Sequence, residues 1–385
     1  MTFEKFFEQF RTTPIWQRME QTVEDSPWNR EDNVAVHTEM VLQEFDKIAK
    51  DFNFSNEALL IGKIALLFHD TGKPHTEEEK VSETRGVYRS YAGHELSSAR
   101  EFENYWCSHV QEIYDLFFEG VDEKERYEDT VHQYMYYITW FIEHHLPYDL
   151  KKKDRREIFR THVHEVEEML ESTGLFGAIL TADCHGRISD DHETKKANVV
   201  AWIKDFYAIE PLKLSIWNDK RVCILIGVSG SGKTTMRNEL EENYCYVTHS
   251  WDDLRLEFFK EKGGASSKNY ADSAAFYDAA HAFADEHASD FGTYVDRHYV
   301  NLLNHHDSVL VDNLNLSAKR RRRFIDIARK KGFSVNATLL PVSLANLHER
   351  ADVRTDHKVP HDRISSMFWT LQQPTLGEFD SVYVN

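Results

Sequence analysis

The chain is poor in cysteine, and its four cysteines stand far apart in the 385 residues. They include no CxxC pair, which favours reduced, mostly buried thiols over a disulfide framework or a zinc knuckle. No apolar run is long enough to cross a bilayer. The first residues alternate charge with Phe and lack a signal-peptide pattern. We therefore expect a cytoplasmic protein with no membrane partner.

Positive charge is also scarce, since 46 Lys and Arg stand against 65 Asp and Glu, for a formal net charge of −19. Because phosphate contacts depend on Lys and Arg, this composition argues against a protein that coats nucleic acid non-specifically. It leaves room for a small basic groove. Two clusters, at residues 151–156 and 319–323, are candidates for such a groove, and each is equally consistent with a solvated charged surface.

Two hydrophobic patterns divide the chain. From Met1 to about Leu212, apolar residues recur at helical spacings of three and four. Short β-rich apolar runs then occur at 221–227, 308–312 and 335–340, with helical stretches between them. This alternation is typical of an α/β domain with a parallel sheet. We predict an all-α domain at residues 1–212 and an α/β domain at residues 213–385.

A phosphate-binding motif opens the second half. Residues 227–234 match GxxxxGK(S/T), after an apolar strand and before a helix, which is the context the motif requires. Glycines let backbone amides turn onto phosphate oxygens, and the helix N-terminus adds partial positive charge. Lys233 should contact the β- and γ-phosphates, and the Thr234 hydroxyl should ligate Mg²⁺. The predicted residues for ATP or another nucleoside triphosphate are Gly227, Ser229, Gly230, Ser231, Gly232, Lys233, Thr234 and Thr235.

Carboxylates further along can complete this P-loop site. Asp252 follows a short β-like run, where it can act as general base for a substrate hydroxyl, and Arg255 can hold an acceptor anion. Asp252 and Asp253 would also suit a helix N-cap. Asp312 ends an apolar strand, where either a Mg²⁺-associated carboxylate or an ordinary turn residue is expected.

Arg350 and Arg354 stand four residues apart before a proline. They can converge on the donor phosphates and offset charge in the transition state, or they can belong to a solvated helix face. Together with the P-loop, these motifs resemble, in order, the kinase domain of phage-type 5′-hydroxyl polynucleotide kinases. The match also takes in residues 312–316, 320–321, 358–360 and 364–367.

That resemblance implies a P-loop kinase with a helical lid. Asp252 would activate a 5′-hydroxyl, Arg255 and Asp253 would bind the terminal nucleotide, and Arg350 and Arg354 would be lid arginines on the donor. Residues 263–306 do not align with the family and could reshape the acceptor groove.

The first half contains histidines and aspartates in a pattern suited to metal binding. Such side chains at helix ends can converge in a helical bundle on one or two divalent metals. A carboxylate shared between two metals would position a hydroxide for attack on phosphorus. Any one of these histidines, taken alone, is more often structural. The candidate ligands are His37, His69, Asp70, His94, His144, His145 and Asp183.

The ordered set resembles the HD phosphohydrolase superfamily, whose signature H…HD…D maps to His37, His69-Asp70 and Asp183, with Asp190 a rival for the last position. The resemblance implies that His94, His144 and His145 are second-metal ligands of its two-metal branch, with transition metals bound. It also implies catalytic roles for Asp70 and for Lys73, which would bind substrate phosphate.

An HD domain ahead of a polynucleotide kinase domain resembles the bacterial and phage RNA end-healing enzymes. This implies phosphorylation of 5′-hydroxyl ends and removal of a 3′-phosphate or a 2′,3′-cyclic phosphate, on RNA or DNA ends destined for a ligase. Two alternatives stay open. One is a nucleoside or nucleotide kinase fused to a nucleotide phosphohydrolase. The other is a nucleotide-sensing protein that uses its P-loop without turnover.

Overall fold

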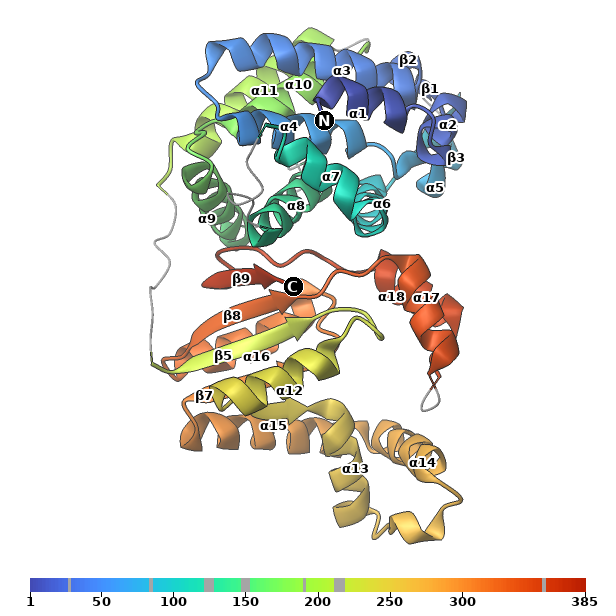
Figure 1. Ribbon diagram of the computed structural model, residues 1–385, viewed down its shortest axis with the longest axis vertical. Coiled ribbons are helices and arrows are strands. Elements are labelled where there is room, and N and C mark those ends of the chain that lie inside the picture. Colours follow the sequence, from blue (N-terminus) through green and yellow to red (C-terminus); the bar gives the residue numbers. More distant parts are fainter. Residues whose placement is uncertain are drawn as a thin grey trace. The chain divides into compact units, whose positions relative to one another are not determined.

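The computed structural model describes residues 1–26, 29–82, 86–120, 128–146, 153–189, 192–210, 219–354 and 358–385. The chain forms two compact units (Figure 1). Unit 1 is Met1–Leu214 with Thr375–Gly377 and Val384, and unit 2 is Ser215–Pro374 with Glu378–Tyr383 and Asn385. The expected boundary at 212/213, the rival ligand Asp190, and Lys151 and Lys152 of the first basic cluster lie outside the described residues. None of the helices within these ranges is both long and apolar enough to cross a membrane.

Unit 1 is mainly helical. Its helices are α1 (Phe3–Phe10), α2 (Pro14–Gln21), α3 (Val34–Ile48), η1 (Ala49–Asp51), α4 (Asn56–Phe68), α5 (Lys73–Thr76), α6 (His94–Ser108), α7 (Val110–Phe117), α8 (Glu128–Glu143), α9 (Lys153–Met169), α10 (Leu175–His185) and α11 (His192–Tyr207). The central one is α4, which packs against α3, α6, α8 and α10. Ser55 caps its N-terminus by accepting from the Ala58 amide, and nearly all of its later residues are buried.

Unit 1 also contains two antiparallel hairpins, so the expectation of a purely helical first domain was wrong in this respect. They are β1 (Val23–Ser26) with β2 (Asn29–Asn33), and β3 (Glu78–Ser82) with β4 (Gly86–Ser90). The β2 sequence NREDN and the β3 sequence EEKVS carry mostly charged residues. Such strands lack the alternating apolar pattern by which strands are identified.

Unit 2 is built on a five-stranded sheet of order β6-β7-β5-β8-β9. β5 lies parallel to β7 and to β8, and β6 lies parallel to β7, which confirms the predicted parallel sheet. The strands are β5 (Arg221–Ile226), β6 (Val247–Ser250), β7 (Ser308–Asp312), β8 (Ser334–Leu339) and β9 (Ser381–Val384). The helices are α12 (Lys233–Tyr244), α13 (Trp251–Lys262), η4 (Ser267–Asn269), α14 (Ser273–Glu286), α15 (Ala288–His305), α16 (Ala318–Lys330), α17 (Leu344–Val353) and α18 (His361–Trp369).

The parallel arrangement brings three chain segments to one edge of the sheet. The carboxyl ends of β5, β6 and β7 point the same way, so the segments that follow these strands meet there. These segments are the P-loop, the start of α13, and Asp312 with the turn after it. Ligands of open parallel sheets bind at this edge, so the fold assembles a site from residues distant in sequence.

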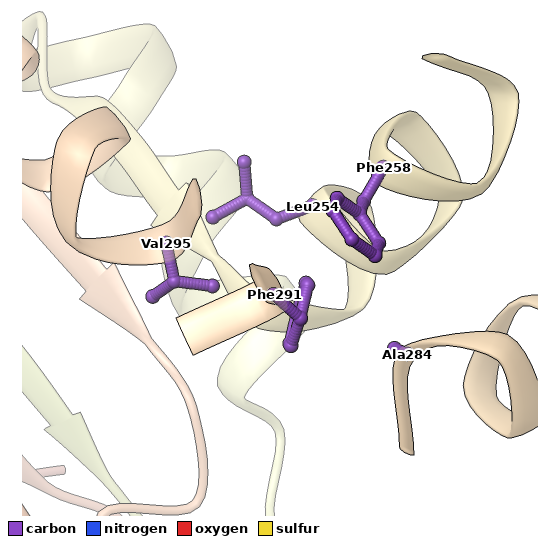
Figure 2. Close-up of a cluster of buried hydrophobic side chains, with 5 residues drawn as sticks. All are labelled: Leu254, Phe258, Ala284, Phe291 and Val295. Carbon is purple, nitrogen blue, oxygen red and sulfur yellow. The ribbon is translucent and has the colours of Figure 1, made fainter. Parts of the chain in front are cut away.

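Residues 263–306, which had no counterpart in the expected family pattern, form η4, α14 and α15. These helices pack on α13 through a hydrophobic cluster (Figure 2). The ring centroids of Phe258 and Phe291 lie 5.4 Å apart. The members of the cluster, shown as sticks, are Leu254, Phe258, Ala284, Phe291 and Val295. The insertion is therefore a packed helical layer on α13, the helix whose first turn carries Asp252.

Candidate functional site

In unit 1, several helix ends converge on Asp70. His69 and Asp70 follow the last residue of α4, and His37 lies within α3. His94 is the first residue of α6, and the preceding Gly93 has a φ of 82°, the left-handed conformation that glycine adopts at little cost. All of these side chains are buried. Residues far apart in sequence thus form one polar cluster inside an apolar bundle.

The first half of the cluster gathers around Asp70 Oδ2. The His37 and His69 Nε2 atoms lie 3.4 Å and 3.1 Å from this oxygen, and 3.3 Å from each other. Asp183 of α10 approaches from the other side, with Oδ1 at 3.3 Å from His37 Nε2 and 3.6 Å from His69 Nε2. This is the H…HD…D set expected from the sequence, brought together in space.

The second half gathers around the other oxygen of the same carboxylate. Asp70 Oδ1 lies 3.0 Å from His94 Nε2 and 3.7 Å from His145 Nε2. The two Nε2 atoms are 3.3 Å apart. Two groups of candidate ligands therefore share Asp70, one on each carboxylate oxygen.

The outer nitrogens of three rings are engaged by the backbone. Nδ1 of His69 lies 2.6 Å from the Leu66 carbonyl, and Nδ1 of His94 and His145 each lie 2.7 Å from the carbonyls of Tyr91 and Ile142. Each Nδ1–H can donate to its carbonyl, which leaves the Nε2 lone pair directed at the cluster. This arrangement is typical of histidines that bind metals.

The spacing of these atoms fits divalent metals. The Nε2 atoms of His37 and His69 lie 3.3 Å apart, as do those of His94 and His145. A tetrahedral ion with bonds of about 2.0–2.1 Å separates its nitrogen ligands by roughly 3.3–3.4 Å. His37 with His69, and His94 with His145, therefore suit two ions bridged by Asp70.

Electrostatics keep the carboxylates ionised. Burial would raise the pKa values of Asp70 and Asp183, but neighbouring cations hold both well below the ordinary range. For His69, burial lowers the pKa, and Asp70 and Asp183 outweigh that effect and raise it to about 10. For His145, burial and the neighbouring His69 and His94 lower the pKa to about 3. The two ionised carboxylates favour a cation at this cluster, and a divalent metal would bind His69 by displacing the proton of that ring.

Charged residues that the sequence analysis did not single out surround this cluster. Arg187 donates to both oxygens of Asp183 at 2.9 Å and 2.7 Å. Its spacing of four residues from Asp183 could have revealed it. Glu31 lies 3.7 Å from His37 Nδ1 and accepts from the Ile188 amide. Nothing in the sequence of the charged β2 strand marks this residue.

Lys73, expected to meet substrate phosphate, is buried in ion pairs. Its Nζ lies 2.7 Å from Asp70 Oδ2 and 2.5 Å from Glu24 Oε1. Burial opposes the charge, but Asp70 and Glu24 raise the pKa of Lys73, so it stays cationic. Lys73 thus places a positive charge next to the shared carboxylate, and Glu24 is its second anchor.

His144 lies outside both ligand groups. Its ring stacks on Trp140 at a centroid distance of 4.3 Å, and its Nδ1 bonds to the Trp140 carbonyl at 2.9 Å. Burial lowers its pKa. The structure therefore brings together all of the expected ligands of this unit except His144.

In unit 2, the P-loop has the backbone that its glycines predict. Gly230 and Gly232 have φ values of 89° and 99°, which disfavour any other residue. A Cβ on Gly227 would lie 2.3 Å from Ser231 Oγ. The Lys233 ammonium donates to the carbonyls of Gly227 and Val228 at 3.0 Å and 2.9 Å. Amides, hydroxyls and this lysine form the start of a phosphate cradle.

Lys233 is surrounded by the acids expected from the sequence. Burial lowers its pKa to about 8, against the opposing effect of Asp312 and Asp252 and with a further lowering by Arg354. Burial raises the pKa of Asp312, which also lies 3.7 Å from Arg237. The three groups at the carboxyl ends of β5, β6 and β7 thus share one electrostatic environment.

Ser250, and neither aspartate, is the N-cap of α13, because its hydroxyl accepts from the Asp253 amide. Asp252 and Asp253 stand in the first turn. Asp252 Oδ1 accepts from Arg255 Nη1 at 2.9 Å, whereas Asp253 pairs with Arg237 at 2.7 Å. Asp252 is therefore the aspartate of the two that contacts Arg255.

The two arginines expected to form a lid lie at the end of α17. Arg350 donates to the Gly230 carbonyl at 2.9 Å, so it touches the P-loop directly. Arg354 is the C-cap residue of α17 and interacts electrostatically with Lys233. The next three residues, 355–357, lie outside the described ranges.

Two side chains of α14 that the sequence analysis missed, Tyr277 and His281, complete the surroundings of Asp252.

A comparison with protein families matches residues 222–374 to a family described as an AAA domain. The matched segment runs from β5 past α18 and includes the whole P-loop site. It is a kinase-like P-loop domain. Such a domain binds a nucleoside triphosphate with Mg²⁺. No curated protein matches the chain.

Proposed function

We propose that the protein is a bifunctional nucleic-acid end-healing enzyme. A P-loop polynucleotide kinase in residues 213–385 phosphorylates 5′-hydroxyl ends. An HD phosphohydrolase in residues 1–212 removes 3′- or 2′-phosphates and opens 2′,3′-cyclic phosphates. The products are RNA or DNA ends that a ligase can join. The observation that supports the proposal is that one chain gathers two groups of candidate catalytic side chains, one around Asp70 and one around Lys233 and Asp252.

The kinase reaction follows from the P-loop site. The 5′-oxygen attacks the γ-phosphorus, the bond from that phosphorus to the β,γ-bridging oxygen breaks, and the hydroxyl proton passes to Asp252. Lys233 exchanges its two carbonyl partners for phosphate oxygens. Thr234 and Asp312 would hold Mg²⁺. Arg350, already at the Gly230 carbonyl, and Arg354 offset the charge on the transferred group.

The hydrolase reaction uses the Asp70 cluster. His37, His69, Asp70 and Asp183 would hold one divalent metal, and Asp70, His94 and His145 would hold a second. Bound divalent metals polarise a phosphoryl oxygen and lower the pKa of water. Lys73 is held by Glu24 beside the shared carboxylate and adds positive charge near the substrate phosphate. Water adds to phosphorus as the bond to the 3′- or 2′-oxygen breaks, and that oxygen takes a proton.

The alternative is a nucleoside or nucleotide kinase fused to a nucleotide phosphohydrolase, since both sites would suit small phosphorylated molecules. Competition separates the two. With labelled ATP and Mg²⁺, equal concentrations of a 5′-hydroxyl oligonucleotide and of its free nucleosides compete for the enzyme. Our proposal predicts label almost entirely on the oligonucleotide. Label on the nucleosides would overturn it in favour of the alternative, and tight ATP binding with no labelled product would indicate a nucleotide sensor.

A further inference from the structure

Helix α14 presents two polar side chains next to the proposed catalytic base. Phe276, Ala280 and Ala284 are spaced by four residues and form the buried stripe of α14 against its neighbours. Tyr277 and His281 are also four apart and follow this stripe by one position, so they lie on an adjoining side of the helix. The packing of α13, α14 and α15 in Figure 2 fixes the helix that carries them.

Both side chains reach the Asp252 carboxylate. His281 Nε2 lies 3.5 Å from Asp252 Oδ1, and the Tyr277 side chain forms a hydrogen bond with Asp252. The Tyr277 and His281 rings are 4.2 Å apart. The Nε2 atom of His281 is buried. Among the described residues, no acceptor lies at the distance and angle of a normal hydrogen bond to it. Its acidic neighbour is Asp252, and a small rotation would close that contact, as often happens when an active site is loaded.

The charges around Asp252 come from several elements. Arg255 of its own helix donates to the same oxygen, Oδ1, that His281 faces. Lys233 and Arg354 lie across the site, and Asp312 is the opposing acid. Although burial raises the pKa of Asp252, contacts with His281, Arg255 and Tyr277 lower it overall. For Tyr277, burial and Asp252 raise the pKa to about 12, so it remains a donor at neutral pH.

We propose that His281 and Tyr277 are positioning residues that hold the Asp252 carboxylate in the orientation needed to take the proton of the acceptor hydroxyl. This inference rests on the proposed kinase function. With Oδ1 engaged by Arg255 and faced by Nε2 of His281, Oδ2 is the oxygen that accepts the proton as the 5′-oxygen bonds to phosphorus. Helix α14 of the insertion thus contributes two residues, Tyr277 and His281, to the surroundings of the catalytic base.

The test compares His281→Ala, His281→Gln and Tyr277→Phe with the wild type on a 5′-hydroxyl oligonucleotide. His281→Ala should lower kcat by about 10- to 100-fold, the scale of outer-shell positioning groups, with KM for ATP within about twofold. His281→Gln should restore most of the loss, because its amide keeps a donor near the Nε2 position. The exposed His305 on α15 gives the matched control, His305→Gln, which should match the wild type.

The pH profile of kcat provides a readout that a purely structural role would not move. Removing a donor from the carboxylate raises the pKa of Asp252, so the acidic limb should shift to higher pH in His281→Ala and Tyr277→Phe. If His281→Ala fails to fold, Tyr277→Phe, which keeps the ring, decides the matter by the same shift. Wild-type kcat and an unmoved acidic limb in the folded variants would overturn the inference while the proposed function stands. A wild type that phosphorylates no 5′-hydroxyl acceptor would overturn both.

Discussion

At the scale of single residues, Asp70 occupies the central place in unit 1. Its two oxygens face two different pairs of histidines, and Lys73 neutralises part of its charge. Asn at position 70 keeps the shape of the side chain but removes the negative charge that two cations would share. Asp70→Asn should therefore lose metal and lower phosphohydrolase activity by about 100-fold or more, as measured by elemental analysis and by phosphate release. The exposed His164 on α9 gives the control, His164→Gln, and unchanged metal content in Asp70→Asn would contradict the bridging role.

The two consecutive histidines after α8 should differ in the same measurement. His145 Nε2 faces Asp70 and His94, whereas the His144 ring stacks on Trp140. We expect His145→Gln to reduce metal content and His144→Gln to retain it. Both variants should be checked for folding, because both side chains pack in the bundle. Loss of metal in a folded His144→Gln protein would restore His144 to the ligand set.

Most residues of the Asp70 cluster could be predicted from the sequence. The residues that could not be predicted were missed for physical reasons. The motifs at His69-Asp70 and His94, with His37 and Asp183, predicted candidate ligands that the fold brings together. Adjacent residues near a helix end point about 100° apart, so sequence alone could not say which of His144 and His145 faces inward. The second anchors, Glu24 and Glu31, lie in charged strands where nothing distinguishes them from solvated residues.

At the scale of elements, the turn between β5 and α12 depends on its glycines. Gly232 has a φ of 99°, and a Cβ added there would meet no atom within 4 Å, so backbone strain alone opposes a side chain. Gly232→Ala should cost roughly 1–2 kcal/mol of unfolding free energy and weaken nucleotide binding. Gly292 of α15 also has open space but lacks a positive φ, so Gly292→Ala should stabilise the protein by up to about 1 kcal/mol. Urea unfolding measures both, and equal effects of the two substitutions would contradict the strain argument.

The order of elements was largely predictable in unit 2 and less so elsewhere. The apolar runs at β5, β7 and β8 gave the parallel sheet, because buried parallel strands are almost continuously apolar. The hairpins of unit 1 were not predicted, because strands such as β2 and β3 carry mostly charged residues and lack an alternating apolar pattern. Residues 263–306 form ordinary amphipathic helices, but their placement beside Asp252 depends on tertiary packing through Phe258 and Phe291. Local periodicity carries no information about that contact.

At the scale of the whole molecule, each unit builds its site from its own residues. The Asp70 cluster uses side chains of unit 1, and the P-loop site uses side chains of unit 2. Two self-contained sites should fail independently when one is disabled.

The most direct test of this account follows both ends of one RNA strand that bears a 5′-hydroxyl and a 2′,3′-cyclic phosphate. The strand is incubated with ATP, Mg²⁺ and a transition metal, using the wild type, Lys233→Ala and Asp70→Asn. We predict that the wild type changes both ends, Lys233→Ala changes only the 3′ end, and Asp70→Asn changes only the 5′ end. Loss of both activities in either folded variant, or a wild type that leaves both ends unchanged, would contradict the two-site account.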